Sequence, residues 1–357
     1  MKKNILIAPL NWGLGHASRC VPIINGFLAL GHHVILASDG DAKKMLEKEF
    51  PSLIIESLPS YNITYPKNEF FAWHMAKKLP SILAAIKQEH QLLKKLIVRH
   101  NLNVVVSDNR YGMYSDKVKS IIITHQLQLK APVFEKMISN VIQNKLLNFD
   151  VVWVPDVENE NNLSGELSHG DWSQIDPVYI GGLSRMTEIS SIPISNDQLD
   201  EGFILAIISG PEPQRTKFEK IIFEQAKELN EQVVIVGGSF AKKETTMKGN
   251  ILSIPFAKSG QIKWLIQKSN AVVSRSGYST IMDLCALKKC AILVPTPGQT
   301  EQEYLVRHLK TRNIFVSQNQ FDFDLQKALT QVNSLHWNWE FNGLQENTQL
   351  KEVLTHI

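Results

Sequence analysis

The chain has 357 residues, of which 43% are hydrophobic and 20% are charged, and its formal net charge is +3. This length suits two domains, and the composition excludes a disordered, collagen-like or coiled-coil protein. So small a net charge is unlike that of nucleic-acid-binding proteins, so we expect no nucleic acid partner. The three cysteines, Cys20, Cys285 and Cys290, are too scattered for a disulfide framework or a metal site.

The first apolar run, residues 5–10, is interrupted by Pro9 and stops at Asn11. It is too short for a secretory signal and instead predicts a buried first strand. No run approaches the roughly 20 apolar residues that a membrane-spanning helix needs. We therefore expect a soluble, cytoplasmic protein.

Short apolar runs alternate with segments of helical period along the chain. In the first half, strands are predicted at residues 4–8, 33–37, 53–56, 103–107, 120–124, 151–154 and 178–180. In the second half, they are predicted at residues 203–209, 232–236, 250–254, 271–274, 291–295 and 313–316. The clearest helical segments are residues 18–30, 81–99, 214–229, 280–287 and 300–311. Apolar strands separated by helices are typical of parallel sheets covered on both faces, so the fold class is α/β.

The alternation stops at residues 183–201, a polar segment that contains Pro193. This break predicts a first domain at residues 1–184, a linker and hinge at 185–201 and a second domain at 202–340. Each domain is expected to be a doubly wound, Rossmann-like sheet, and the two face each other across a cleft. Ligands of such sheets bind beside the carboxyl ends of the strands, so the loops directly after strands are the candidate sites.

The loop after the first strand places Gly13, Gly15 and His16 at the start of a helix. Imidazole is disfavoured as a cation at a helix N-terminus, so His16 is a candidate general base. An ordinary strand-to-helix turn is the alternative. Another is a dinucleotide site, in which Gly13 and Gly15 approach a phosphate and Asp39 binds the ribose.

Two further strands of the first half end in polar residues. Asp108 and Asn109 follow one of these strands, and His125 and Gln126 follow the next. Both loops should emerge on the same edge of the sheet as His16. Asp108 is suited to orient a histidine or to bind hydroxyl groups, and common turn chemistry is the alternative.

In the second half, Ser209 and Gly210 precede a helix whose N-terminal amides are suited to phosphate. The loop after residues 271–274 opens another helix, and Asp283 follows one turn inside it. This pairing suits a diphosphate at the helix start with ribose hydroxyls donating to Asp283. The alternative is a capping box formed by Thr280 and Asp283.

A third loop of the second half, residues 295–303, is fixed by two prolines. It places Gln299, Gln302 and Glu303 near the same edge of the sheet. These side chains either bond sugar hydroxyls or cap the helix that follows.

Together, the Gly-Leu-Gly-His loop, the Ser274-Arg275-Ser-Gly-x-Ser-Thr-x-x-Asp283 segment and the Pro-x-Pro-Gly-Gln-x-x-Gln-Glu loop resemble those of GT-B glycosyltransferases. More narrowly, they resemble family 28, the MurG-like UDP-GlcNAc transferases. The Gly-Leu-Gly-His-Ala start is most similar to that of a bacterial group of uncharacterised predicted glycosyltransferases. The resemblance covers nearly the whole chain in element order and is concentrated in the loops.

The resemblance implies an inverting, metal-independent transferase without a cofactor. It would move a sugar, such as an N-acetylhexosamine, from a UDP-sugar donor to a hydroxyl acceptor. A sugar or a lipid-linked acceptor of cell-envelope glycan biosynthesis fits this resemblance. Closure of the two domains over the hinge would exclude water, and residues 341–357 would form a helix that packs back toward the first domain.

The resemblance also assigns roles to residues. In the first domain, which would take the acceptor, His16 is the first candidate base and Asp108 the second. Gly13, Gly15, Asn109, His125 and Gln126 would lie on the acceptor side. The second domain would bind the nucleotide sugar through Ser209, Gly210, Arg275, Ser276, Gly277, Ser279, Thr280, Asp283, Gln299, Gln302 and Glu303. Asp283 replaces the ribose-binding Glu of the family, and Gln302-Glu303 replaces its sugar-binding Gln pair.

A basic stretch at residues 67–100 carries seven Lys and Arg against two Glu. Phe70, Phe71 and Trp73 precede its predicted helix. Such a segment resembles an interfacial helix that contacts anionic lipid, which suits a peripheral protein at the inner face of the membrane. A solvated helix face with snorkelling lysines is the alternative.

Three other functions stay open. A UDP-sugar hydrolase on the same fold would use water in place of the acceptor, and the Gly-His-x-x-Arg-Cys segment resembles such enzymes. An NAD-dependent oxidoreductase would use Gly13, Gly15 and Asp39. A non-catalytic nucleotide-sugar-binding protein would share most of the binding residues.

Overall fold

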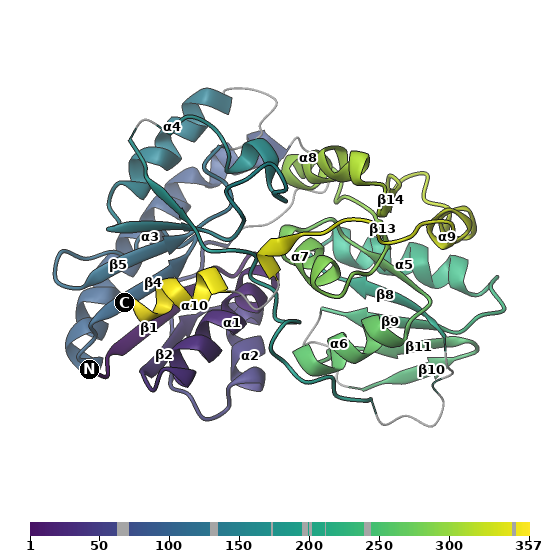
Figure 1. Ribbon diagram of the computed structural model, residues 1–357, viewed down its shortest axis with the longest axis horizontal. Coiled ribbons are helices and arrows are strands. Elements are labelled where there is room, and N and C mark those ends of the chain that lie inside the picture. Colours follow the sequence, from purple (N-terminus) through teal and green to yellow (C-terminus); the bar gives the residue numbers. More distant parts are fainter. Residues whose placement is uncertain are drawn as a thin grey trace. The chain divides into compact units, whose positions relative to one another are not determined.

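The computed structural model describes residues 1–62, 71–128, 135–172, 174–194, 199, 202–210, 212–238, 244–344 and 348–357. Side chains are described within these ranges except at 71–77, 135–138 and 342. The chain forms two compact units (Figure 1), one made of Met1–Ser184 with Asn342–Ile357 and the other of Arg185–Phe341. Each unit has its own sheet and its own buried apolar core.

The first unit contains a seven-stranded sheet in the order β3-β2-β1-β4-β5-β6-β7, with every neighbouring pair parallel. Its strands are β1 (Asn4–Pro9), β2 (His33–Ser38), β3 (Ile55–Ser57), β4 (Val104–Asp108), β5 (Lys119–Ile123), β6 (Val151–Val154) and β7 (Pro177–Tyr179). The strand order reverses between β1 and β4. Ligands of such sheets bind outside the carboxyl ends of the strands at this reversal.

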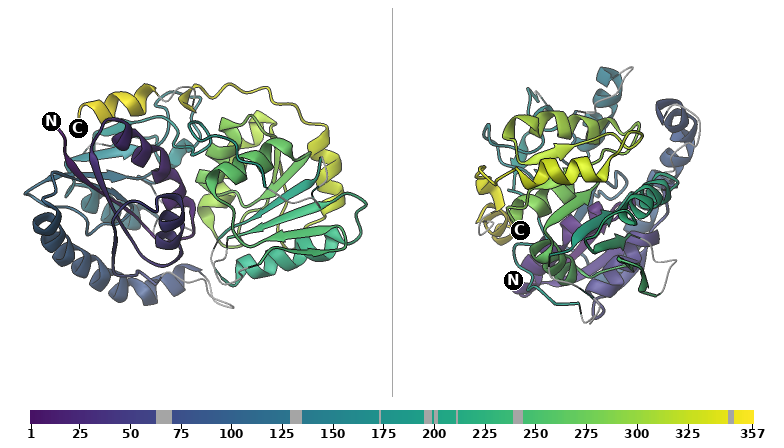
Figure 2. Two further views of the ribbon diagram at one scale, coloured as in Figure 1. Left: turned by 90° about the horizontal axis from the view of Figure 1, so that it is seen from below. Right: turned by 90° about the vertical axis from the view of Figure 1, so that its right-hand side faces the viewer.

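Helices α1 (Gly15–Ala29), α2 (Gly40–Glu49), α3 (Phe71–His100) and α4 (Glu135–Leu146) and the 3₁₀ helix η1 (Gly165–Leu167) lie between these strands in the chain. The 3₁₀ helix η3 (Asn342–Leu344) and the last helix, α10 (Thr348–Thr355), belong to the same unit. Helix α10 lies beside α1 (Figure 2), where the Leu354 side chain occupies the space that a Cβ at Gly26 would need. The end of the chain therefore packs on the unit that contains its beginning.

The second unit contains a seven-stranded sheet in the order β10-β11-β9-β8-β12-β13-β14. Its strands are β8 (Ile204–Ile208), β9 (Val233–Gly237), β10 (Thr246–Lys248), β11 (Ile251–Ile254), β12 (Ala271–Ser274), β13 (Ala291–Leu293) and β14 (Phe315–Ser317). Its helices are α5 (Gln214–Ala226), α6 (Ser259–Lys268), α7 (Tyr278–Ala286), α8 (Thr300–Leu309), the 3₁₀ helix η2 (Lys310–Arg312) and α9 (Leu325–Asn333). The β10–β11 pair is antiparallel and the other pairs are parallel. Here the strand order reverses between β8 and β12.

Two elements differ from the sequence-based prediction. Strand β10 was not predicted, because its three residues are a short antiparallel edge without an apolar run. Helix α3 begins at Phe71 and continues through Pro80, ten residues before the expected start. Phe71 and Trp73 are therefore part of the helix and do not precede it, while Phe70 lies outside the described residues.

The segment expected to be a free linker is attached to the second unit over residues 185–194. The backbone N–H of Ile192 donates to the carbonyl of Gly260 at 3.0 Å, and Lys263 Nζ donates to the carbonyl of Ile189 at 2.8 Å. The unit boundary lies between Ser184 and Arg185. Residues 185–194 are thus attached to α6 by hydrogen bonds. Residues 195–198, 200 and 201 lie outside the described residues.

Candidate active site

In the first unit, His16 and Asp108 meet at the carboxyl ends of β1 and β4, where the strand order reverses. His16 is the second residue of α1 and Asp108 the last residue of β4. The distance between His16 Nδ1 and Asp108 Oδ1 is 2.8 Å. Asp108 has no exposed surface, whereas 12% of the His16 side chain is exposed. This arrangement leaves the histidine as the member of the pair that can meet a ligand.

Arg19 is the site residue that the sequence analysis missed. Its Nε donates to Asp108 Oδ2 at 2.5 Å, a second guanidinium nitrogen contacts Asp108 Oδ1, and a third lies 2.8 Å from His125 Nδ1. Arg19 is three residues after His16 in α1, so both side chains lie on one face of the helix. That spacing was a signal for the contact. Arg19 joins three of the predicted site residues, His16, Asp108 and His125, into one buried cluster.

The hydrogen bond with Asp108 determines which ring nitrogen of His16 carries the proton. Burial alone would raise the pKa of Asp108, but the Arg19 guanidinium and His16 outweigh it and hold the pKa of this carboxyl well below its usual range. An ionised carboxylate only accepts hydrogen bonds, so the contact with Asp108 requires the tautomer in which His16 Nδ1 carries the proton. Arg19 Nη2 lies 3.0 Å from the same nitrogen and then donates to Asp108 Oδ1 instead. The other ring nitrogen, Nε2, is then the basic one.

This geometry corrects the second candidate for the base. Both carboxylate oxygens of Asp108 accept hydrogen bonds from Arg19, and the side chain is buried, so it cannot reach an acceptor hydroxyl. Asp108 orients His16 and balances the charge of Arg19.

The remaining predicted residues of the first unit surround this cluster. Gly13 adopts a positive φ of 74° in the turn before α1, and Gly15 is the first residue of that helix. Asn109 has φ 56°, and its Oδ1 is buried without a hydrogen-bond partner among the described residues. The backbone N–H of Gln126 donates to Thr124 Oγ1 at 3.1 Å and so shapes the turn after β5.

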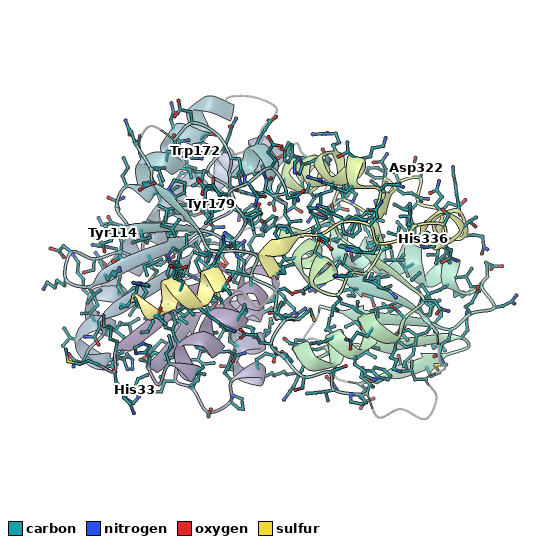
Figure 3. All side chains as sticks on the ribbon, in the orientation of Figure 1. His33, Tyr114, Trp172, Tyr179, Asp322 and His336 are labelled. Carbon is teal, nitrogen blue, oxygen red and sulfur yellow. The ribbon has the colours of Figure 1, made fainter. Side chains whose placement is uncertain are left out.

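The loop that carries His125 is anchored by the loop after β6. The backbone N–H groups of Leu127 and Gln128 both donate to the carbonyl of Leu167, at 2.8 and 3.0 Å. The labelled residues Trp172 and Tyr179 (Figure 3) both donate to the carbonyl of Ser168, at 3.2 and 2.7 Å. These bonds fix the position of His125 beside Arg19.

Asp39, which the oxidoreductase alternative requires, is used inside the protein. Asn11 Nδ2 donates to Asp39 Oδ2 at 3.2 Å, and the Arg110 guanidinium forms an ion pair with Asp39 Oδ1. Arg110 also contacts Glu89 and donates to the carbonyl of Pro9 at 2.9 Å. The carboxylate is therefore part of a structural network and is not free to bind a ribose, which corrects that expectation.

In the second unit, α7 offers an open N-terminus. Its N-cap residue is Gly277, which has no side chain to cap the helix, and the first turn contains no acidic residue. The helix begins at Tyr278, so Ser279 and Thr280 lie inside its first turn. The capping-box alternative for Thr280 and Asp283 is therefore wrong. Backbone N–H groups at such a helix start favour an anion.

Asp283 lies one turn into α7, and only 8% of its side chain is exposed. Arg185, the first residue of the second unit, approaches its Oδ2 with Nε at 3.2 Å. The carboxylate is thus held in place beside the open helix start.

The start of α5 is different, because a carboxylate already occupies it. Glu212 accepts from the backbone N–H of Thr216 at 3.2 Å, from Thr216 Oγ1 at 3.0 Å and from Arg215 Nε at 3.0 Å. Burial alone would raise the pKa of Glu212, but the bonds from Thr216 and Arg215 lower it, so the group is ionised. The expectation that this helix start meets a phosphate is corrected: Ser209 and Gly210 follow β8, and the Glu212 carboxylate already accepts a hydrogen bond from the first turn of α5.

The loop at residues 295–303 is tied to the start of α7. Gln302 Oε1 accepts from the backbone N–H of Thr296 at 2.8 Å, and Ser276 Oγ donates to the backbone carbonyl of Gln302 at 3.1 Å. Gln299 is at the N-cap position of α8 but makes no side-chain capping bond within the described ranges. Glu303 Oε1 accepts from the backbone N–H of Gly298 at 3.3 Å. Capping of α8 therefore does not explain Gln299.

Arg275 is buried and bonds to backbone carbonyls of distant loops, so its role is structural. This corrects its predicted role in nucleotide binding. It is 1% exposed and donates to the carbonyls of Val294, Pro295 and Gln214 at 3.2, 3.2 and 3.0 Å. Its guanidinium carbon lies 4.1 Å from the centroid of the Phe218 ring. Burial lowers the pKa of Arg275 to about 9, so it is still charged at neutral pH. Its bonds hold the β13 loop against the start of α5.

The basic stretch lies mainly on α3. Lys87, Lys94 and Lys95 are exposed there, as are Leu83 and Val98. Residues 67–70 of the stretch lie outside the described residues. Within the described ranges, no helix combines the length and hydropathy needed to cross a membrane. No group of three His, Cys, Asp or Glu side chains suited to a metal ion is found in the same part of the chain.

Comparison with known proteins agrees with this architecture. Residues 209–341 match the glycosyltransferase family 28 C-terminal domain. An uncharacterized glycosyltransferase of Methanopyrus kandleri is 19% identical over 294 residues, which cover 81% of this chain and 84% of that protein. One from Methanosarcina mazei is 24% identical over 344 residues, which cover 84% of this chain and 81% of that protein.

Solved structures show the same fold at low identity. The glycosyltransferase of kitacinnamycin has a TM-score of 0.62 at 12% identity and covers 99% of this chain and 95% of its own. Acinetobacter baumannii MurG has a TM-score of 0.51 at 12% identity, with 100% of both chains covered. The glycosyltransferase VinC in complex with dTDP has a TM-score of 0.55 at 11% identity and covers 99% of this chain and 94% of its own.

These findings define the class of protein. The fold is that of GT-B glycosyltransferases, and residues 209–341 of the second unit match the family 28 C-terminal domain. The chain is a glycosyltransferase.

Proposed function

We propose that the chain transfers a sugar from a UDP-sugar to a hydroxyl acceptor with inversion at the anomeric carbon. The observation that carries this proposal is the contact between His16 Nδ1 and buried Asp108, since it leaves Nε2 of a partly exposed histidine as a base. The first unit would take the acceptor, and the second would bind the donor.

The acceptor is activated by His16. Nε2 takes the proton of the acceptor hydroxyl as the oxygen attacks the anomeric carbon, and the bond from that carbon to the diphosphate oxygen breaks. The imidazolium that forms is stabilised by the Asp108 carboxylate. Arg19 keeps Asp108 ionised and fixed, so the histidine is oriented before the substrate arrives.

The donor is held by the start of α7. Its backbone N–H groups would bind the diphosphate, which leaves with the negative charge developed in the reaction. Asp283, one turn further, would accept hydrogen bonds from the ribose hydroxyls. Gln299 and Glu303 would contact the sugar, and Gln302 would hold their loop in place through Thr296.

The nature of the donor and acceptor rests on similarity. The dTDP complex of VinC supports a nucleoside diphosphate sugar, and the family 28 domain supports UDP and an N-acetylhexosamine. Exposed lysines and apolar side chains on α3 suit a lipid-linked acceptor at an anionic membrane surface.

Turnover with and without acceptor tests the proposal. The protein is incubated in EDTA with UDP-N-acetylglucosamine or UDP-glucose, and with soluble monosaccharides or a membrane lipid extract. We expect UDP release that depends on the acceptor, with a product of inverted anomeric configuration by NMR. Equal UDP release and free sugar without any acceptor would instead identify a UDP-sugar hydrolase.

A further inference from the structure

Two buried hydroxyl groups in the second unit have no hydrogen-bond partner among the described residues. Ser274 and Thr296 are each 1% exposed, and neither Ser274 Oγ nor Thr296 Oγ1 bonds to any residue that the structure describes. Buried polar side chains in native proteins almost always have a partner, and the exceptions call for an explanation. Valine has the shape of threonine, so packing alone does not require the hydroxyl of Thr296.

Both hydroxyls lie at the carboxyl ends of neighbouring strands. Ser274 ends β12, and Thr296 follows β13, whose Leu293 pairs with Ser274 in the sheet. A Cβ at Gly210 would lie 4.0 Å from Thr296 Oγ1, so this hydroxyl faces the glycine that follows β8. The loops after β8, β12 and β13 therefore meet where the strand order reverses.

The same place adjoins the open start of α7. Gln302 accepts from the backbone N–H of Thr296, and a Cβ at Gly277 would lie 3.9 Å from Gln302 Nε2. Gly277 is the N-cap residue of α7 and Gly210 has φ 104°, so both loops lack a side chain where a ligand would approach. The Thr296 hydroxyl and the Gln302 amide thus lie next to the glycines of these two loops.

We propose that the Thr296 hydroxyl donates a hydrogen bond to the diphosphate of the donor, and that the Ser274 hydroxyl lies beside it in the same subsite. This inference rests on the proposed function and adds two residues to it. Ionised phosphate oxygens only accept hydrogen bonds. They therefore suit the hydroxyls of Ser274 and Thr296, which donate to no described residue. Neither Thr296 Oγ1 nor Gln299 Oε1 has a partner in the described part of the chain, so a phosphate bound here would break no hydrogen bond of these two atoms.

The experiment compares wild type, Thr296→Val, Thr296→Ser and the control Thr330→Val. Thr330 is exposed, and its hydroxyl donates to the carbonyl of Gln326 at 3.0 Å. The Kd is measured by calorimetry for the nucleotide among UDP, dTDP and GDP that binds wild type most tightly. The Tm of each ligand-free protein is measured as well.

For Thr296→Val we expect a Kd about 10-fold higher, as for a lost hydrogen bond to a charged group. The ligand-free Tm of this variant should rise by about 2–4 °C, since an unpaired buried hydroxyl is removed. Thr296→Ser should bind like wild type because it keeps the hydroxyl, and Thr330→Val should leave the Kd unchanged.

An unchanged Kd for Thr296→Val would overturn the inference, and so would a Thr296→Ser variant as weak as Thr296→Val. If Thr296→Val does not fold, Thr296→Ala replaces it in the comparison with Thr296→Ser, with the same expected weakening and the same contrary result. Failure of the proposed function looks different, because wild type itself would then bind none of the three nucleotides.

Discussion

At the strand-order reversal of the first unit, the charged side chains around Arg19 form one hydrogen-bonded cluster, while Asn109 Oδ1 beside it has no partner among the described residues. At the strand-order reversal of the second unit, several buried polar side chains have no partner among the described residues. Arg19 connects Asp108 and His125 below His16 in the first unit. In the second unit, the hydroxyls of Ser274 and Thr296 are buried without partners among the described residues. The cluster of the first unit contains a histidine and the carboxylate that orients it, as proton transfer requires. The arrangement in the second unit is suited to a ligand that brings its own negative charge.

The largest effect is expected when the charge balance of the first unit is broken. Asp108→Asn leaves the buried Arg19 without its counter-charge, so the free energy of unfolding should fall by about 3 kcal/mol. Turnover should fall at least about 10²-fold, because His16 loses its orienting partner. Urea unfolding and initial rates measure both.

The matched control for that variant is Asp41→Asn, which removes an exposed carboxylate paired with Lys44. It should change stability by less than about 1 kcal/mol. If Asp108→Asn is no less stable than this control, the cluster does not have the charge balance described here.

Replacing His16 separates proton transfer from donor binding. His16→Ala should lower turnover about 10²-fold or more, while the Kd for UDP and the Tm stay near those of wild type. His100→Ala, which removes a histidine paired with Glu56 on the same unit, is the control. Near-normal turnover of a folded His16→Ala protein would remove His16 as the base.

A substitution in the second unit should change the affinity for the nucleotide. Asp283→Ala should weaken UDP binding about 10-fold, because the ribose hydroxyls lose their acceptor. Asp322→Ala, which alters an exposed carboxylate of the same unit (Figure 3), should leave the affinity unchanged. Unchanged affinity in Asp283→Ala would contradict the ribose assignment.

The smallest effect concerns pH. The pKa of Asp108 is lower in the folded chain than the value of about 3.9 expected when unfolded. Its carboxylate therefore contributes stability that is fully present above about pH 5 and is lost as the pH falls through the unfolded pKa toward the folded one. In urea unfolding, the stability difference between wild type and Asp108→Asn should stay constant from pH 7 to about pH 5 and narrow as the pH falls below about 4. A constant difference would argue against an ionised, buried Asp108.

The fold was predictable because long apolar runs leave few alternatives. Strands β6 and β12 begin and end at the predicted residues, whereas the exposed edge strand β10 has no apolar run to mark it. The strand ends also predicted that His16, Asp108 and His125 share one edge.

Long-range partners were not predictable from the sequence. Arg19 is fixed by residues 89 and 106 positions away, and Arg275 looked like a ligand-binding residue although it braces carbonyls of distant loops. The Pro-Glu-Pro segment gave no hint that Glu212 fills the start of α5. Side-chain contacts of this kind depend on tertiary packing, which sequence spacing does not encode.

The most direct test of the account is calorimetric titration of the whole protein, in EDTA, with UDP, dTDP, GDP and NAD⁺. We expect micromolar binding of UDP that Asp283→Ala weakens and His16→Ala does not. Binding of NAD⁺ alone, or UDP binding that depends on His16 and not on Asp283, would contradict the division of acceptor and donor roles between the two units.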